Sequence, residues 1–363
     1  MSNTKKRVYK LNEIVNIELG ERIVKGNSEV GQYPVYGGGD WSFHTNRFNR
    51  EGTNIIIGRF ALSPKCTRIV FGKLFLNDSG FTVSPKDEKV LNKKYLIFVI
   101  QKMNDIIFSL ARGAGQQNLN MSDFENLEIE IPESIEEQKR IAEILTNVDE
   151  NISNIEEEIK QLDNIKTGLV LKLTSKYEDV KSLSELGDIV GGLTYSPNDV
   201  VNEGGKIVLR SPNISEDGLL ELKDIVRVEK NIGKSCLKHN DILICVRNGS
   251  KRLIGKSLLI DKRVEGESFG AFMSVFRTKY SRYIYNLFNS PIIKEQISKN
   301  LGATINQITN KDINEYRIPF PFDESDILIF NEVMENFLNL IEIKKKELKK
   351  LRNIKSSFLD MLI

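Results

Sequence analysis

The sequence is poor in the residues that many enzymes and all membrane spans require. Histidine occurs only as His44 and His239, and the single tryptophan is Trp41. With only two histidines, the sequence does not favour a zinc site or a histidine-based catalytic triad. The longest apolar run, 95–100, is far below the ~20 residues that cross a bilayer. No apolar segment follows the basic start, so we expect neither a signal peptide nor a membrane partner.

Cysteine is also scarce, and its spacing does not suggest a metal site or a disulfide. The three residues are Cys66, Cys236 and Cys245, which predicts free thiols and a cytoplasmic protein. Motifs for phosphate loops, nucleophile elbows and zinc proteases do not occur, and 37–39 lacks the spacing and the lysine of a phosphate loop. The acidic stretch 85–89 is better explained as a solvated turn than as a nuclease centre. We therefore predict no catalytic residue, no metal ligand and no cofactor for this chain.

The composition is that of a folded protein with more than one domain. The chain has 363 residues, of which 40% are hydrophobic and 28% charged, with a net charge of +2. The charges are clustered: 133–163 is mainly acidic, whereas 59–73 and 247–256 are rich in lysine and arginine. Local clusters matter more than the total charge for binding a polyanion.

The chain repeats itself once. The segment 11–14 recurs as 183–186, Gly113 matches Gly302, and 162–166 matches 351–355. From Gly113 onward the two copies stay in register without a gap. Such a repeat predicts two halves built on one plan.

Each half begins with short β-branched or aromatic runs bounded by turn residues, which predict strands. These runs are 53–58, 67–71, 205–209, 241–246 and 270–276. A helical segment follows in each half, at 93–110 and 281–301. A polar loop, a strand ending near proline and a long helix complete the half.

The long helices carry apolar residues in alternating steps of four and three, a heptad seam over about three heptads. The seam residues are Ile141, Leu145, Val148, Ile152, Ile155, Ile159 and Leu162, and then Phe330, Met334, Phe337, Ile341, Leu348 and Leu351. Each seam could pack on its own domain; we favour packing of the two seams on each other as an antiparallel pair. Lys344 interrupts the second seam, where it either fixes the register or extends to solvent, the option we favour.

These patterns together predict an α+β fold. Two repeat-related globular domains, 1–132 and 177–322, are joined by two long antiparallel coiled-coil helices, 133–176 and 323–363.

Candidate DNA-contacting residues in the first half lie on glycine-rich or polar loops. Glycine lets the backbone approach a ligand closely, while arginine and amide side chains bond base edges and phosphates. The alternatives are an ordinary tight turn, a solvated surface and a plain connecting loop. The candidates are Gly37, Gly38, Gly39, Arg47, Arg50, Arg59, Lys65, Arg112, Gln116, Gln117 and Asn118.

The second half offers a stronger candidate, the loop 246–252 that follows a predicted strand. Arginine suits guanine and asparagine suits adenine, whereas lysine and serine suit phosphates. The loop 209–213 is a weaker candidate, and the loop before the second long helix matches the polar loop of the first half. The candidates are Arg210, Asn213, Arg247, Asn248, Ser250, Lys251, Arg252, Asn306 and Gln307.

Taken in order, these segments resemble the specificity subunit of type I restriction-modification systems over almost the whole chain. The matching pieces are YPVYGGG, NIIIGR, GAGQQNLN, GATINQIT, the helix entry at 131–138, and the helix ends DNIKTGLVLKL and RNIKSSFLDML. The second helix entry, PFDESDIL, departs from the pattern because it lacks the counterpart of Glu137 and Gln138. The first half has no evident equivalent of VRNGSKR beyond Gly58 and Arg59.

The resemblance implies a subunit that binds double-stranded DNA and catalyses nothing. Each recognition domain would read half of a bipartite, asymmetric site, and the helices would set the gap between the halves. The partners would be two methyltransferase subunits, which bind S-adenosylmethionine, and restriction subunits, which use ATP and magnesium. Three alternatives remain: a solitary DNA-binding or anti-restriction homologue, a coiled-coil adaptor between proteins, and a nuclease.

Overall fold

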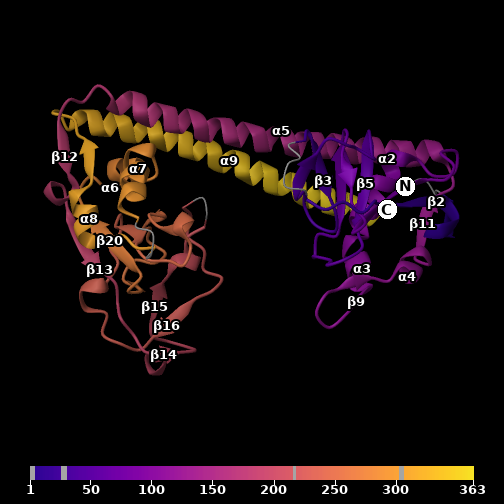
Figure 1. Ribbon diagram of the computed structural model, residues 1–363. Helices are drawn as coiled ribbons and strands as arrows, with labels where there is room; N and C mark the ends of the chain where they lie inside the picture. Colours follow the sequence, from indigo (N-terminus) through magenta and orange to yellow (C-terminus); the bar gives the residue numbers. More distant parts are fainter. Residues whose placement is uncertain (1–4, 26–30, 216–217, 302–305) are drawn as a thin grey trace. The chain divides into compact units, whose positions relative to one another are not determined.

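The structure, a computed structural model, describes residues 5–25, 31–215, 218–301 and 306–363. The chain falls into two units, one made of 1–156 with 346–363 and the other of 157–345. The boundary therefore crosses both long helices instead of falling at their ends. Each unit holds one globular head and one stretch of each long helix (Figure 1).

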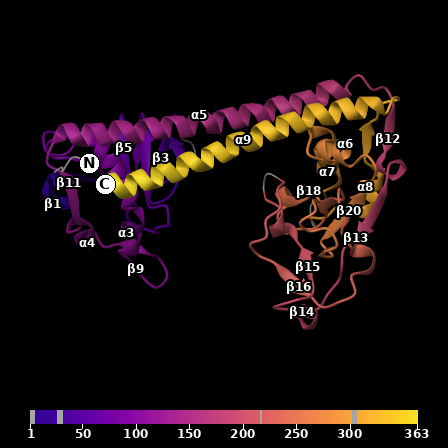
Figure 2. The same ribbon diagram turned by 180° about the vertical axis from the view of Figure 1, so that it is seen from behind.

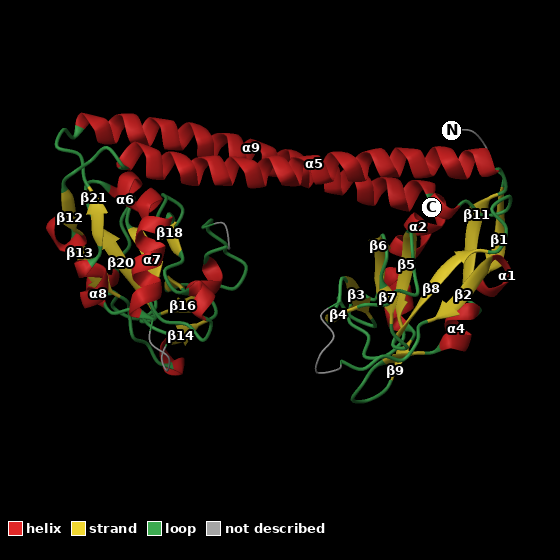
Figure 3. Cartoon of the chain, turned by 45° about the horizontal axis from the view of Figure 1, so that its top comes forward, coloured by secondary structure: helices red, strands yellow, loops and turns green. Residues whose placement is uncertain are grey.

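The first head is built on a four-stranded antiparallel sheet in the order β2-β8-β5-β6 (Figure 3). A smaller sheet, β4-β3-β7, and the strand pairs β1–β11 and β9–β10 complete it. Its elements are β1 (Lys6–Lys10), α1 (Leu11–Ile14), β2 (Val15–Leu19), β3 (Tyr33–Tyr36), β4 (Phe43–Thr45), β5 (Thr53–Gly58), β6 (Thr67–Phe71), β7 (Phe75–Leu76), β8 (Gly80–Pro85), α2 (Lys93–Lys102), α3 (Asn104–Ser109), β9 (Ala111–Arg112), β10 (Asn118–Leu119), α4 (Met121–Glu125) and β11 (Glu128–Pro132).

The second head has the same plan, with a sheet in the order β13-β20-β17-β18, a second sheet β14-β16-β15-β19 and the pair β12–β21 (Figure 2). Its elements are β12 (Val180–Ser182), β13 (Asp188–Gly191), β14 (Val200–Val201), β15 (Lys206–Leu209), β16 (Val226–Val228), β17 (Ile242–Cys245), β18 (Ser257–Leu259), β19 (Ser268–Phe269), β20 (Met273–Arg277), α6 (Ser281–Phe288), α7 (Pro291–Asn300), α8 (Asn310–Glu315) and β21 (Arg317–Pro319).

Matching hydrogen bonds confirm the predicted repeat. The backbone N–H of Leu11 donates to the carbonyl of Leu127, and that of Leu183 donates to Tyr316, both at 2.9 Å. In each head a central strand also runs parallel to a two-residue strand, β3 with β7 and β15 with β19. Gly302, the repeat counterpart of Gly113, lies outside the described residues.

The predicted strands 53–58 and 67–71 coincide with β5 and β6. The two predicted helical segments are each broken into a pair, α2 with α3 and α6 with α7. The second break has a local cause. Ser290 caps α7 by accepting the N–H of Ile292 at 3.3 Å, and Pro291 occupies the first turn, where its missing N–H is harmless.

The long helices are α5 (Ile135–Thr174) and α9 (Ser325–Leu362), of 40 and 38 residues. Within the first unit they are antiparallel, because Lys355 pairs with Asp149 at 2.6 Å and Arg352 with Glu156 at 2.7 Å. Across all residues that the structure describes, no helix is both long and apolar enough to cross a membrane.

The second unit shows the same antiparallel pairing. Lys344 contacts Glu158 at 2.7 Å and Lys176 contacts Asp326 at 3.0 Å. The Lys344 amine, expected to extend to solvent, thus meets a carboxylate of the facing helix. A single pair of this kind contributes little to the free energy of folding, but a series of such pairs favours one register.

All seam residues are buried or half-buried, and their contacts combine the two packing modes considered from the sequence. Ile141 and Leu145 of α5 belong to the core of the first head, and Phe358 and Leu359 of α9 pack against that core. In the second unit Phe330 and Met334 of α9 share a core with Val170 of α5. Each helix stretch therefore packs on both its head and the other helix.

Candidate nucleic-acid interface

In the second head, three segments meet where β17 ends. The N–H of Val246 donates to the carbonyl of Phe272 at 3.0 Å, and the N–H of Ile308 donates to Val246 at 2.9 Å. The N–H of Asn248 donates to the carbonyl of Asn306 at 3.2 Å. We call this meeting of 246–249, 270–272 and 306–308 the second junction. It joins two loops that sequence analysis had singled out separately.

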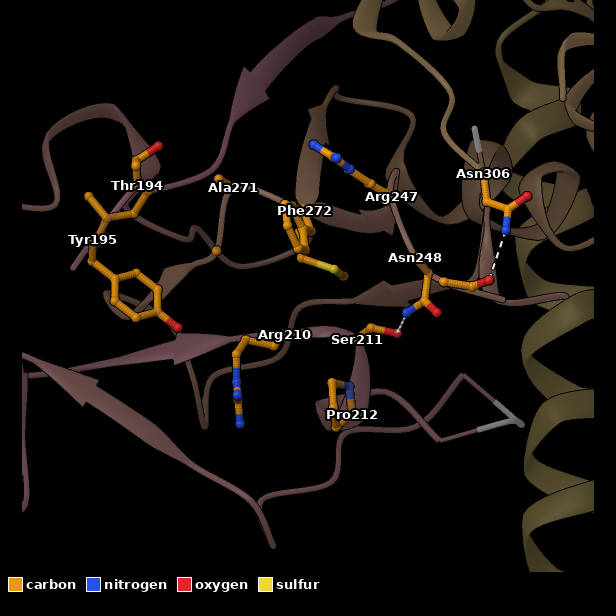
Figure 4. A pocket seen from close by; sticks show the side chains of 14 residues that line it. Thr194, Tyr195, Arg210, Ser211, Pro212, Arg247, Asn248, Ala271, Phe272 and Asn306 are labelled. Atoms are coloured by element: carbon orange, nitrogen blue, oxygen red, sulfur yellow. Dashed lines mark hydrogen bonds between the residues drawn. The ribbon is translucent and has the colours of Figure 1, made fainter. Parts of the chain in front are cut away.

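An open cleft of about 980 Å³ lies at the second junction (Figure 4). Among its lining residues, all of which the structure describes, there is no aspartate or glutamate, whereas two are arginines. The lining consists of Leu193, Thr194, Tyr195, Arg210, Ser211, Pro212, Arg247, Asn248, Gly249, Gly270, Ala271, Phe272, Met273 and Asn306. A cleft with guanidinium and amide donors and no carboxylate suits an electron-rich, anionic ligand.

Several polar side chains of the cleft are fixed by the protein. The Asn248 amide donates to the Ser211 hydroxyl at 3.2 Å, and the Asn306 amide donates to the backbone carbonyl of Gly249 at 2.8 Å. Arg210 pairs with Asp224 at 2.9 Å, while its Nε atom is buried without a partner. These bonds orient the donors before any ligand binds, which reduces the entropic cost of recognition.

The first head has an equivalent meeting of segments, which we call the first junction: 59–62, 77–79 and 117–119. The N–H of Arg59 donates to the carbonyl of Ser79 at 2.8 Å, and the N–H of Leu119 donates to Arg59 at 2.9 Å. The N–H of Leu62 donates to the carbonyl of Gln117 at 2.9 Å. The strand end and the polar loop proposed from the sequence are therefore neighbours here too.

The glycine-rich loop packs into the first junction. A Cβ atom at Gly38 would lie 2.3 Å from the carbonyl oxygen of Phe60, and one at Gly37 would lie 2.4 Å from the Ser79 hydroxyl. The close backbone approach for which glycine is needed is thus made to the protein itself. Gly39 is exposed, with open space around its Cβ position.

Two of the predicted polar side chains are buried and bonded inside the fold. Arg50 is 7% exposed, and its guanidinium donates to the Thr82 hydroxyl and to the carbonyl of Leu19, both at 2.9 Å. Asn213 is 1% exposed, and its amide donates to the carbonyl of Asp224 at 3.0 Å. Buried polar groups need such partners. We therefore assign both residues to holding loops together and leave them out of the interface.

The other predicted residues lie at or near the surface. Arg112 pairs with Asp123, and the Asn118 side chain accepts the N–H of Ala61 at 3.3 Å. Gln307 is half-buried, next to Ile308 of the second junction. The exposed set is Arg47, Lys65, Gln116, Gln117, Ser250, Lys251 and Arg252.

Sequence analysis missed the aromatic side chains of the junctions. Phe272 is 57% exposed in the cleft, Tyr195 lines it from the segment after β13, and Phe60 follows Arg59 in the first junction. The repeat could have pointed to the segments that contain Phe60 and Phe272, because equivalent segments meet in both heads. It could not have pointed to the phenylalanines themselves, because they are not at matching repeat positions.

The electrostatics of the buried thiols do not favour nucleophilic chemistry at the junctions. Burial raises the pKa of Cys245, which ends β17, and raises that of Cys66 to about 11. Both thiols stay protonated at neutral pH and are therefore weak nucleophiles. Among the described residues no cluster of histidine, cysteine, aspartate or glutamate could hold a metal ion.

The chain has two repeat-related heads, and each has a junction that carries an arginine. These features define a two-headed binding protein, and comparison with known proteins agrees. The family model for the type I restriction modification DNA specificity domain matches residues 3–164 and 175–353. A type I restriction enzyme specificity subunit of Methanocaldococcus jannaschii is 25% identical over 332 residues, which cover 80% of this chain and 75% of the relative.

Solved structures share the fold. A type I restriction-modification S subunit from M. genitalium aligns with a TM-score of 0.62 at 19% identity, covering 100% of this chain and 97% of the other. A chain from a structure on complex assembly and conformational transition of the type I restriction-modification system aligns with a TM-score of 0.55 at 14% identity, covering 100% and 99%. The chain belongs to the type I restriction-modification DNA specificity family.

Proposed function

We propose that this chain reads double-stranded DNA through its two junctions, as the sequence-reading part of a type I restriction-modification complex. The observation that supports this proposal is the backbone arrangement that the two junctions share. The same backbone hydrogen bonds join the same segments in both heads, but the side chains of these segments differ. Binding proteins vary their specificity by changing loop side chains on a backbone scaffold that stays the same.

The chemistry of the second junction suits base edges. Guanidinium and amide groups can form paired hydrogen bonds with purine edges in the major groove. The exposed cations Lys251 and Arg252 beside the cleft suit phosphates, which position a protein on the duplex but carry no sequence information. We therefore assign base reading to the cleft and backbone contacts to its rim.

The two junctions should select different half-sites, because their side chains differ. Arg59, Phe60 and Ser79 stand in the first where Val246, Arg247 and Phe272 stand in the second. The DNA target is then bipartite and asymmetric. A selection experiment that returned one contiguous palindrome would contradict this proposal.

The long helices set the gap between the half-sites in this proposal. At 1.5 Å per residue, a helix of 40 residues is about 60 Å long, and a helix holds a separation that a loose linker does not. The chain scaffolds two methyltransferase subunits and restriction subunits. S-adenosylmethionine, ATP and magnesium are then bound by those partners, and this chain catalyses no step.

The decisive experiment is methylome sequencing of cells that express the methyltransferase subunit with or without this chain. We expect methylation at one bipartite motif only when both are present. Titration with salt should weaken binding of the purified complex steeply. A chain that does not co-purify with the methyltransferase subunit would be a solitary homologue; one without sequence preference would be an adaptor. Metal-dependent cleavage by the purified chain would indicate a nuclease.

A further inference from the structure

Each junction stacks an arginine on a phenylalanine, but the two pairs come from different repeat positions. In the first junction the Arg59 guanidinium lies 4.7 Å from the ring centroid of Phe60. In the second the Arg247 guanidinium lies 5.1 Å from the ring centroid of Phe272 (Figure 4). Matching backbone hydrogen bonds make Phe60 the counterpart of Arg247, since their N–H groups donate to the carbonyls of Ser79 and Phe272 respectively.

The same chemical pair is therefore built twice, from different repeat positions: the counterpart of Arg59 is Val246, and that of Phe272 is Ser79. In the first junction Arg59 and Phe60 are the first and second residues after β5. In the second, Arg247 is the second residue after β17, and Phe272 belongs to the turn before β20 (Met273–Arg277). Inheritance from one ancestral repeat would place the pair at matching positions. The two pairs are therefore not explained by duplication of a single ancestral pair.

Both guanidinium groups keep their hydrogen-bonding edges available. Within the described part of the chain, neither Arg59 nor Arg247 forms a side-chain hydrogen bond or an ion pair. Two other arginines that the sequence suggested as DNA contacts are paired with carboxylates: Arg112 with Asp123, and Arg210 with Asp224. The contact with a ring holds the plane of the guanidinium without using any of its five N–H donors.

We infer that each arginine–phenylalanine pair reads one guanine, so that each half-site contains a guanine whose identity depends on Arg59 or on Arg247. Guanine presents O6 and N7 as adjacent acceptors in the major groove, and the arginine fork matches them with two parallel bonds. Phe60 and Phe272 are positioning residues that hold the fork. This inference rests on the proposed function and adds to it the base that is read.

The availability of Phe272 supports a role at the interface. Phe272 is 57% exposed in a cleft that also holds Tyr195, and exposing large apolar surface to water is unfavourable. DNA in the cleft would remove this surface from water and strengthen the attraction between the ring and the cation, because desolvation raises cation–π energies.

The test is selection from a library of randomised double-stranded DNA with the chain in complex with its methyltransferase subunit. Arg247→Lys keeps the charge but loses the fork. We expect this variant to lose guanine preference at one position of one half-site, lowering affinity for the selected site roughly 5- to 100-fold. Binding to random DNA should be unchanged. Arg59→Lys should do the same in the other half-site only.

Arg7→Lys is the matched control. Arg7 is exposed and lies 5.0 Å from the ring centroid of Tyr9, but it is outside the junctions, so this variant should select the wild-type sequence. The role of Phe272 is tested by Phe272→Leu, which should weaken preference at the position that Arg247→Lys affects. Phe272→Tyr, which keeps the ring, should restore it; a merely structural role would not act on one base position.

The outcomes separate the inference from the proposed function. If the wild-type complex selects no sequence, the proposed function is wrong. If it selects a bipartite site but Arg247→Lys retains every base preference, or weakens all sequences equally, the inference is wrong, and in the second case Arg247 contacts a phosphate. A selected half-site without a required guanine would also overturn the inference.

Discussion

The Gln138 side chain offers a sharp test of how a long helix is attached to its head. It is fully buried in the first turns of α5. Its carbonyl oxygen accepts the N–H of Asn92 at 2.8 Å, and its amide donates to the carbonyls of Val90 at 2.9 Å and Pro132 at 2.8 Å. One side chain thus satisfies three backbone groups. Gln138→Leu keeps a similar volume and removes all three bonds.

The expected cost follows from the groups left without partners. A buried donor or acceptor without a partner costs about 1–3 kcal/mol. Three such groups cost about 3–9 kcal/mol, and the about 2 kcal/mol gained from burying leucine leaves a loss of about 1–7 kcal/mol in the free energy of unfolding. A loss of that size is a large part of the stability of an ordinary domain.

Urea titration followed by tryptophan fluorescence measures this loss. Trp41 is the only tryptophan of the chain and lies in the first unit, so its signal reports on the head that Gln138 joins. Gln116→Leu is the control, because Gln116 is exposed and its replacement should change the free energy of unfolding by less than about 0.5 kcal/mol. Equal midpoints for the two variants would refute the reasoning.

A second substitution at the same site adds a dependence on pH. Gln138→Glu can still accept the N–H of Asn92, but an ionised carboxylate cannot donate to either carbonyl. Burial penalises the charged form and raises the pKa of the new carboxyl group. This variant should therefore lose stability as the pH rises through that raised pKa and regain it at acid pH. A variant equally stable at pH 5 and pH 8 would contradict the role of the two carbonyl contacts.

Three further outcomes are expected. At pH 8, iodoacetamide should modify Cys236, which is half-exposed, long before Cys66, whose pKa burial raises to about 11; peptide mass spectrometry distinguishes them. Asp241→Asn should cost about 3 kcal/mol in thermal unfolding, because Asp241 is 2% exposed and pairs with Arg277 at 2.7 Å. Gly38→Ala should cost about 1–3 kcal/mol and weaken DNA binding, because its Cβ would overlap a backbone carbonyl of the first junction.

Each of these predictions has its control. In guanidinium chloride all three cysteines should react at similar rates, and equal labelling in the native protein would contradict the assignment. Asp78→Asn changes a half-buried turn residue of the first head and should leave the thermal midpoint nearly unchanged. Gly39→Ala adds a Cβ in open space; if it impairs DNA binding as much as Gly38→Ala, then overlap at Gly38 is not the cause.

Periodicity and the repeat were sufficient to predict the elements. The run 53–58 became β5 as expected, because three consecutive buried isoleucines bounded by turn residues suit few other structures. The long helices extend close to their predicted limits because their apolar steps persist over many turns. The break between α6 and α7 was missed, although a serine before a proline is a recognisable helix start.

The departure in the second helix entry also has a simple physical basis. In the repeat, Ile327 occupies the position equivalent to Gln138. Ile327 is 4% exposed and belongs to the core of the second head. Both residues fasten a long helix to its head, one by hydrogen bonds and the other by apolar contact. The sequence shows that isoleucine replaces glutamine at this position. Only the tertiary structure shows that both side chains attach a long helix to its head.

The sequence alone determined the duplicated plan, the two long helices and the family resemblance, because these depend on patterns that recur along the chain. Tertiary structure decided which polar side chains are buried inside a head and which line the cleft. Arg50 and Arg247 look alike in the sequence, yet Arg50 is bonded inside a head, whereas Arg247 lies against a phenylalanine in a cleft. That difference arises from contacts between segments distant in the chain, and no local pattern records it.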